Sequence, residues 1–246
     1  MRYFLEVSYK GTAYSGFQVQ HNANTVQAEV EKAFLVLQRE KVEMTGSSRT
    51  DSGVHALQNF FHFDHNGGLH PQFLYKLNAI LPADIVARRV IPVADDAHCR
   101  FDATGRRYRY FIYRHKDPFL QDTAYFFPYS LDLEMMKKGA ALLMEYTDFT
   151  SFSKRNTQVK TFECRITESE WALENDLLVY NVTANRFLRG MVRGLVGTML
   201  KLGRHKINLD EFRSIITSRD CSRASFAVPG RGLFLQRVDL PYLSPE

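Results

Sequence analysis

The 246-residue chain lacks the features that mark several large classes of protein. It has no apolar run near the roughly 18 residues that a membrane-spanning helix needs. Its first residues alternate as a strand does, and they carry neither the apolar core nor the cleavage site of a signal peptide. The composition is also not that of a disordered chain. We therefore expect a folded protein that is neither exported nor held in a membrane.

Cysteine is scarce, and its spacing excludes two further classes. The three cysteines, Cys99, Cys164 and Cys221, are odd in number, far apart and without CxxC spacing. Such a set supports neither a disulfide framework nor a zinc knuckle. A reducing compartment, the cytoplasm, is the expected location.

The motifs of the commonest cofactor and hydrolase classes are absent as well. The sequence contains no Walker or dinucleotide glycine-rich loop, no HExxH and no GxSxG. Its eight histidines are dispersed, and a strand over HFDH would place His62 and His65 on opposite faces. We therefore expect no metal and no cofactor.

What is present begins with a mild positive charge. The formal net charge is +5 and the isoelectric point is about 9.1. This balance favours a polyanionic partner such as nucleic acid, but many basic proteins bind no polyanion. Charge alone leaves both readings open.

Hydrophobic periodicity predicts a mixture of strands and helices along the whole chain. Alternating segments predict strands at 2–9, 56–64, 85–93, 106–114 and 232–240, and a hairpin over 164–185 that turns at 174–176. Helical spacing predicts helices at 26–37, 70–81, 131–145, 186–203 and 209–218, the first with Asn24 or Thr25 as its cap. Hairpins together with crossovers indicate an α+β fold. The element types recur after residue 104, so we expect two halves, 1–104 and 105–246, although no repeat of letters links them.

The first chemical motif is GSSRTDSGVHALQNFFHFD at 46–64, in which Arg49 precedes Asp51 by two residues. A guanidinium beside a carboxylate favours its ionised form and restricts its rotamers. An ionised, positioned aspartate serves as a nucleophile or a general base. The alternative is that Asp51 only closes an Asx-turn before Gly53.

The second motif is RRYRYFIYRHK at 106–116, where cations and tyrosines interleave. On a strand, Tyr108 and Tyr110 share one face, whereas Arg107 and Arg109 share the other. Aromatic rings beside arginine are typical of sites that bind unstacked bases and their phosphates. An ordinary edge strand with solvated arginines is the competing interpretation.

The third motif is NRFLRGMVRGLVG at 185–197. At helical spacing, Arg186, Arg189 and Arg193 fall on one side, and neighbouring like charges repel by a few tenths of a kcal/mol per pair. An anion would offset this repulsion, and the nearby Gly190 and Gly197 permit close approach. A solvated helix face is the alternative.

Together, GSSRTDSGVHALQ, CRFDATGRRYRYFIY and NRFLRGMVRGLVGTML, in that order, closely resemble the TruA family of tRNA pseudouridine synthases. The resemblance extends to VSYKGTAYSGFQVQ with the following TVQAEVEKA, to DFTSF at 148–152 and to GLFLQRV near the end. It covers essentially the whole chain. The sequence departs from the family pattern at Lys10, at Ser48, where the family usually has glycine, and at Arg186.

The resemblance implies a role for each matching residue. Asp51 would be the catalytic aspartate, with Arg49 flanking it on the same loop. Tyr108 would contact the target base. Arg193 would reach from the C-terminal half to pair with Asp51.

It also implies a fold and a partner. The fold would be the pseudouridine synthase fold: two ferredoxin-like α/β halves that share a continuous, mainly antiparallel sheet with a basic cleft between them. The partner would be the anticodon stem-loop of tRNA, with uridines 38, 39 and 40 as targets and no cofactor. The protein would be a cytoplasmic homodimer.

A stacked uridine must be flipped out before its base can be rearranged, at a cost of roughly a few kcal/mol. We expect phosphate contacts from the remaining arginines of the two basic motifs to offset that cost and to make binding salt-sensitive; they are Arg106, Arg107, Arg186 and Arg189. Three alternatives stay open: a divergent paralogue that modifies another RNA uridine, a non-catalytic RNA-binding protein, and an enzyme that removes the base with water.

Overall fold

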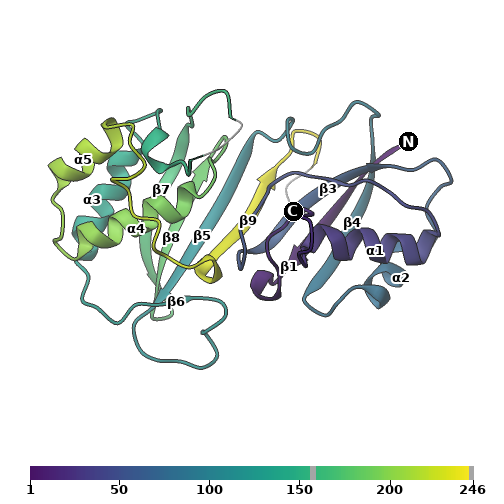
Figure 1. Cartoon of the computed structure of the whole chain (residues 1–246), viewed down its shortest axis with the longest axis horizontal. Coiled ribbons are helices and arrows are strands. Elements are labelled where there is room, and N and C mark those ends of the chain that lie inside the picture. Colours follow the sequence, from purple (N-terminus) through teal and green to yellow (C-terminus); the bar gives the residue numbers. More distant parts are fainter. Residues whose placement is uncertain (156–158, 244–246) are drawn as a thin grey trace. The chain divides into compact units, whose positions relative to one another are not determined.

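The structure is a computed structural model that describes residues 1–155 and 159–243 (Figure 1). The chain divides into two compact units. The first holds Met1–Thr104 together with the chain from Phe234 onward, and the second holds Gly105–Leu233. The final strand, which we placed with the second half of the sequence, therefore groups with the first unit.

Five strands form the sheet of the first unit. Strand β1 (Arg2–Tyr9) pairs antiparallel with β3 (His55–Asp64) on one side and with β4 (Ile85–Val93) on the other. Strand β9 (Leu233–Asp239) pairs parallel with the start of β3, and the short β2 (Thr45–Gly46) pairs antiparallel with its middle. The 3₁₀ turn η1 (Gly11–Ala13) follows β1. The loop between β2 and β3 carries the RTD motif.

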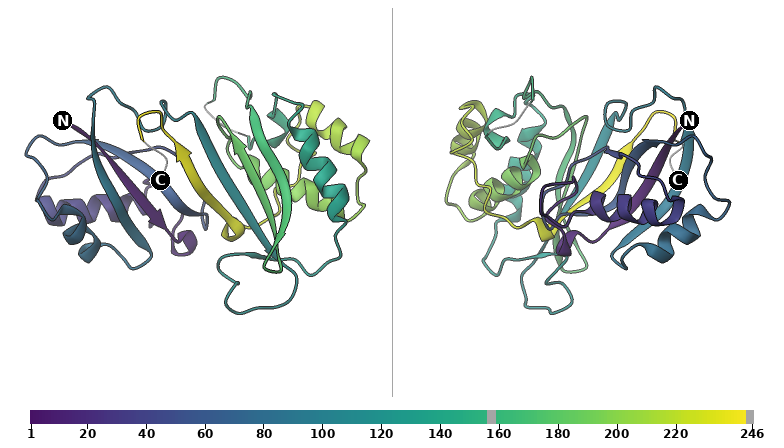
Figure 2. Two further views of the ribbon diagram at one scale, coloured as in Figure 1. Left: turned by 180° about the vertical axis from the view of Figure 1, so that it is seen from behind. Right: turned by 45° about the vertical axis from the view of Figure 1, so that its right-hand side comes forward.

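Helices α1 (Val26–Gln38) and α2 (Phe73–Ile80) lie on the same face of this sheet (Figures 1 and 2). Helix α1 begins where expected because the Thr25 side chain caps it by accepting a bond from the Ala28 amide. Phe34 of this helix is fully buried, and its ring packs edge-on against the rings of Phe63 in β3 and Phe73 in α2. Burial of one such side chain stabilises the fold by about 1.5–3 kcal/mol.

The second unit repeats the combination of an antiparallel sheet and helices. Strand β8 (Leu177–Ala184) pairs with β5 (Gly105–Tyr113) and with β7 (Ile166–Glu174), and the short β6 (Tyr125–Phe126) pairs parallel with β5. The β7–β8 hairpin turns at Asn175 and Asp176, both at positive φ, as a type I′ two-residue loop requires. The 3₁₀ turns η2 (Thr150–Phe152) and η3 (Gly230–Gly232) belong to this unit.

Helices α3 (Leu133–Leu143) and α4 (Met191–Gly203) cover one face of the second sheet, and α5 (Leu209–Thr217) packs beside them (Figures 1 and 2). Trp171 of β7 joins the layers, since its ring packs on Tyr180 and its indole nitrogen lies 3.3 Å from the sulfur of Met199 on α4. Helix α5 begins with a capping box between Asn208 and Glu211. Within the described residues, no helix is long and apolar enough to cross a membrane.

The predicted α+β fold is confirmed, since both units combine a sheet with helices. The continuity of one sheet through both units and the basic cleft between them stay predictions. The predicted helix over 186–203 is wrong in its first turn, because α4 begins at Met191. Gly190, at φ +73°, adopts a left-handed conformation that an α-helix cannot contain. The expected single helical stripe of Arg186, Arg189 and Arg193 is therefore also wrong.

Strand β3 buries a histidine against two other polar side chains. His62 is 7% exposed, its Nδ1 lies 3.3 Å from the Cys99 sulfur, and its ring meets His98 edge-on with centroids 4.4 Å apart. Burial first, and then the nearby His98, lowers the pKa of His62 to about 4.

This histidine predicts a loss of stability in mild acid. The pKa of His62 is about 4 in the folded state and about 6.5 unfolded, so the unfolded chain binds more protons between these values. The free energy of unfolding should fall as the pH drops from 6.5 to 4, by up to about 3 kcal/mol. Urea titrations of wild type and His62→Gln across this window measure the slope, which the variant should flatten. His115→Gln, at an exposed site, should keep it. Equal slopes in wild type and His62→Gln would contradict the assignment.

Candidate functional site

The loop between β2 and β3 holds Asp51 at a tight turn. The Val54 amide donates to the backbone carbonyl of Asp51 at 3.2 Å, and Gly53 supplies the positive φ of +73° that the turn needs. A backbone hydrogen bond therefore closes this turn. Asp51 is half-buried, whereas Arg49 is exposed.

A buried polar network holds the N-terminal half of this loop. Asn59 of β3 is 0% exposed, and its side chain accepts from the Ser48 amide at 3.2 Å and donates to the Ser48 carbonyl at 2.8 Å. Asn59 also donates to the Tyr9 hydroxyl at 3.2 Å, which in turn lies 2.8 Å from the Thr50 hydroxyl. The residue immediately before Asp51 is thus fixed to two strands of the sheet.

The segment after β1 holds the other side of the loop. The Phe17 amide donates to the Thr50 carbonyl at 3.1 Å, and the Ser52 hydroxyl donates to the Tyr14 carbonyl at 3.1 Å. Beyond the turn, His55 Nδ1 accepts from the Gly11 amide at 3.0 Å. Both neighbours of Asp51 are therefore anchored, and its carboxylate is presented on a preorganised backbone.

Sequence reasoning missed this network. A signal was present, since Asn59 is a polar residue in a strand that is otherwise rich in phenylalanine. Ser48 stands where the family usually has glycine, so it adds a hydroxyl to the loop. Within the described residues this Oγ is buried without a hydrogen-bond partner. Such a group costs about 1–3 kcal/mol.

In the second unit, Tyr108 and Tyr110 of β5 are both buried. Tyr110 is fully buried, and its hydroxyl donates to the Pro229 carbonyl at 2.8 Å. Tyr108 is 9% exposed, and its ring meets Phe187 edge-on with centroids 5.0 Å apart. Only the outer edge of Tyr108 is therefore available to a ligand.

The arginines of β5 have partners within the unit. Arg106 is buried and donates to the Asn185 carbonyl at 2.9 Å. Arg107 forms an ion pair with Glu168 of β7 at 2.7 Å, and Arg109 pairs with Glu174 at the end of the same strand. A phosphate that approaches Arg107 must therefore compete with a carboxylate.

The arginines before and within α4 differ in exposure. Arg189 is exposed, and Arg186 is half-buried, with Nη1 3.4 Å from the Thr161 hydroxyl. Arg193, in the first turn of α4, donates through Nε to the Val228 carbonyl at 2.8 Å. The Tyr108–Phe187 and Arg106–Asn185 contacts bring the loop over 185–190 against β5, so the second and third motifs form one surface.

The sequence matches a family model described as tRNA pseudouridine synthase over residues 6–102 and 143–241. These ranges include the whole of the first and third motifs. They do not include the second motif, which lies on β5. The chain belongs to the tRNA pseudouridine synthase family. The match also includes the network residues Tyr9 and Asn59.

Relatives in this family are similar over nearly the full chain. The tRNA pseudouridine synthase A of Parabacteroides distasonis is 43% identical, covering 98% of this chain and 96% of the relative. The protein of the same name from Bacteroides thetaiotaomicron is 45% identical over 98% and 91%. That from Staphylococcus aureus is 37% identical over the same shares. The predicted resemblance is confirmed at the level of the family.

Proposed function

We propose that this protein converts uridine to pseudouridine in the anticodon stem-loop of tRNA and that Asp51 is its catalytic residue. Membership of the family supports the reaction and the RNA class. The Asp51 loop supports the residue, because hydrogen bonds to neighbouring segments fix the backbone on both sides of this carboxylate.

The chemistry is an isomerisation in which atoms balance within the nucleoside. The bond from C1′ to N1 breaks, the uracil turns, a bond from C1′ to C5 forms, C5 loses a proton and N1 gains one. Asp51 acts on the extruded uridine by attack on C1′, by addition to C6 or by removal of a sugar proton. Each route needs an ionised carboxylate. No external acid is needed, because uracil leaves with its charge spread over two carbonyls and stays in the site.

The other site residues have supporting roles in this proposal. Arg193 pairs with Asp51 and positions it, and Arg49 flanks it. Tyr108 contacts the target base through its outer edge. Arg106, Arg107, Arg186 and Arg189 contribute to phosphate binding. Arg189 is the strongest candidate of these four because its side chain is exposed.

Mapping of pseudouridine tests the reaction directly. Unmodified tRNA is incubated with the protein, and carbodiimide-reactive uridines are located by primer extension. New stops at positions 38 to 40, with no change in RNA mass, are expected. Free uracil would identify a base-removing enzyme, stops elsewhere would identify another target uridine, and binding without either product would identify a non-catalytic RNA-binding protein.

The network around Asn59 predicts an effect on turnover through Thr50. In Tyr9→Phe, the hydroxyl that holds Thr50 is lost, so Asp51 is less well positioned. We expect kcat to fall about tenfold, KM to change little and stability to fall by about 1 kcal/mol. Single-turnover assays and urea titrations measure these quantities.

Tyr14→Phe is the matched control for this prediction. Tyr14 is equally buried in the same unit, but its hydroxyl donates to Asp84 at 2.6 Å, away from the loop. It should lose similar stability and keep its kcat. Equal losses of kcat in both variants would show that Tyr9 acts only on the fold.

The same resemblance leads us to propose a cytoplasmic homodimer. Sedimentation equilibrium measures the oligomeric state, and a monomer at micromolar concentration would contradict it.

A further inference from the structure

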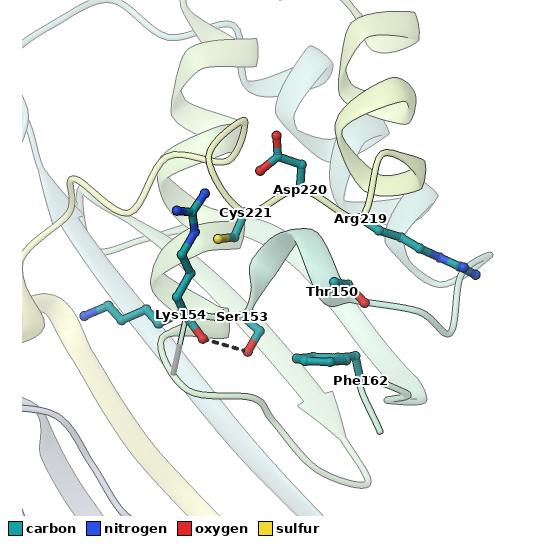
Figure 3. Close-up of a pocket in the computed structure, with 8 residues that line it drawn as sticks. Thr150, Ser153, Lys154, Phe162, Arg219, Asp220 and Cys221 are labelled. Atoms are coloured by element: carbon teal, nitrogen blue, oxygen red, sulfur yellow. Dashed lines mark hydrogen bonds between the residues drawn. The ribbon is translucent and has the colours of Figure 1, made fainter. Parts of the chain in front are cut away.

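A pocket of about 410 Å³ opens in the second unit, outside the residues assigned above (Figure 3). Three segments that are distant in sequence build it: η2 with the residues after it, the segment at Phe162, and the turn after α5. Its lining includes Thr150, Lys154, Arg155, Phe162, Arg219 and Cys221. Its volume lies in the range of about 300–1,000 Å³ that is typical of ligand sites.

Hydrogen bonds hold the walls in place. The Asp148 carboxylate accepts from the Thr150 amide at 2.9 Å and from Arg219 Nε at 2.8 Å, which ties η2 to the turn after α5. The Asp220 amide donates to the buried Ser151 hydroxyl at 3.1 Å. The Phe149 amide donates to the Phe162 carbonyl at 3.1 Å. The DFTSF segment, which carried part of the family resemblance without a role, thus forms one wall.

The lining combines cations with an aromatic ring. The lining contains three cations, Lys154, Arg155 and Arg219, and one carboxylate, Asp220, whose oxygens accept from the amide and hydroxyl of Ser222. Arg219 is partly neutralised by Asp148, so Lys154 and Arg155 supply most of the excess positive charge. A half-exposed ring beside cations suits a base with its phosphate.

The pocket adjoins the loop over 185–190 at two points. The Lys154 amide donates to the Arg189 carbonyl at 3.0 Å, and its side chain packs over Gly190, where a Cβ would lie 3.1 Å from it. Arg186 lies 3.4 Å from the hydroxyl of Thr161, the neighbour of Phe162. An RNA strand bound along this loop would therefore reach the pocket without a break in positive charge.

We propose that the pocket binds one unpaired nucleotide of the substrate RNA, with its base on Phe162 and its phosphate on Lys154 and Arg155. The proposal rests on the proposed function for the identity of the RNA. It adds a second contact, distinct from the target uridine, that anchors the RNA and takes no part in the chemistry.

Binding of unmodified tRNA by paired variants tests the pocket. Phe162→Ala should raise the Kd about tenfold, because stacking on an aromatic ring is lost. Lys154→Ala should raise the Kd and reduce the slope of log Kd against log salt by about one. Phe119→Ala, at a ring 91% exposed in the same unit, and Lys137→Ala, at a cation paired with Glu134, are the controls and should bind as wild type. Values within twofold of the controls would overturn the proposal.

The alkylation rate of Cys221 measures occupancy of the pocket in the wild-type protein, without a substitution in the lining. It is partly exposed in the lining, whereas Cys99 and Cys164 are buried, and burial raises the pKa of Cys164 to about 11. Saturating tRNA should slow alkylation of Cys221 by iodoacetamide at least fivefold, as measured by peptide mass spectrometry. An unchanged rate would overturn the proposal. Protection by millimolar uridine monophosphate or inorganic phosphate, but not by tRNA, would identify a small-anion site and also overturn it.

The outcomes separate this proposal from the proposed function. Pseudouridine formation by the wild type, with normal tRNA binding by Phe162→Ala and Lys154→Ala, rejects the pocket alone. Pocket-dependent tRNA binding without pseudouridine rejects the enzyme and keeps the pocket.

Discussion

Asp51→Asn should bind tRNA as wild type does and form almost no pseudouridine. The amide has the shape of the carboxylate, but it is neutral and acts neither as a nucleophile nor as a base. Loss of the central catalytic group of an enzyme lowers turnover by at least about 10³-fold. The backbone bond that closes the turn and the bonds from Tyr9 and Phe17 that hold Thr50 do not involve this side chain, so the fold should survive.

Single-turnover pseudouridine assays and tRNA binding on the same preparation measure both halves of this prediction. Asp84→Asn is the matched control, because Asp84 is a half-buried aspartate of the same unit that accepts the Tyr14 hydroxyl. It should retain activity within a few fold. Appreciable conversion by Asp51→Asn would remove Asp51 as the catalyst, whatever the control shows.

Arg193→Lys should lower kcat about 100-fold while the protein stays folded. Lysine keeps the positive charge but loses the planar fork, and with it the ability to bond a carboxylate and a carbonyl with separate nitrogens. In the structure Nε donates to the Val228 carbonyl, so the proposed pair with Asp51 would use the terminal nitrogens of the guanidinium. KM should change little, because the residue acts through Asp51 and not through phosphate.

The matched control lies at the other end of the same helix. Arg204, the C-cap residue of α4, packs over the ring of Tyr129 at 4.2 Å, and Arg204→Lys makes the same chemical change there. It should leave kcat within twofold of wild type. An unchanged rate in Arg193→Lys would mean that Arg193 serves only packing. A rise in KM with normal kcat would mean that it contacts phosphate.

Local patterns predicted most elements because a single physical signal decided each of them. Apolar alternation found β1 and β3, and a cap with helical spacing found α1. The same method failed at 186–190, where apolar residues keep helical spacing. The segment is not helical, and it ends at Gly190, which has a left-handed conformation. At its start, the Asn185 side chain accepts from the amides of Arg165 and Arg186.

The partners of the charged residues were beyond local patterns. The sequence shows Arg107 and Arg109 as two cations in a basic run, which suggested phosphate binding for Arg107. The register of β5, β8 and β7 brings Arg107 to Glu168, 61 residues further along the chain, and the Arg109 side chain reaches Glu174, 65 residues further along. Pairing between strands, which no short window contains, decides whether such a cation is already satisfied.

By itself, the sequence determined the α+β composition, the family and the placement of Asp51 on a short polar loop, because each depends on residues that are close in the chain. Only the tertiary structure decided how that loop is held and where the unassigned pocket lies. Tyr9 meets Thr50 across 41 residues and Asn59 across 50. The pocket likewise joins η2 to a turn nearly 70 residues later, since Ser151 and Asp220 are 69 apart. Contacts at such separations follow from strand register and helix packing, which a linear pattern does not encode.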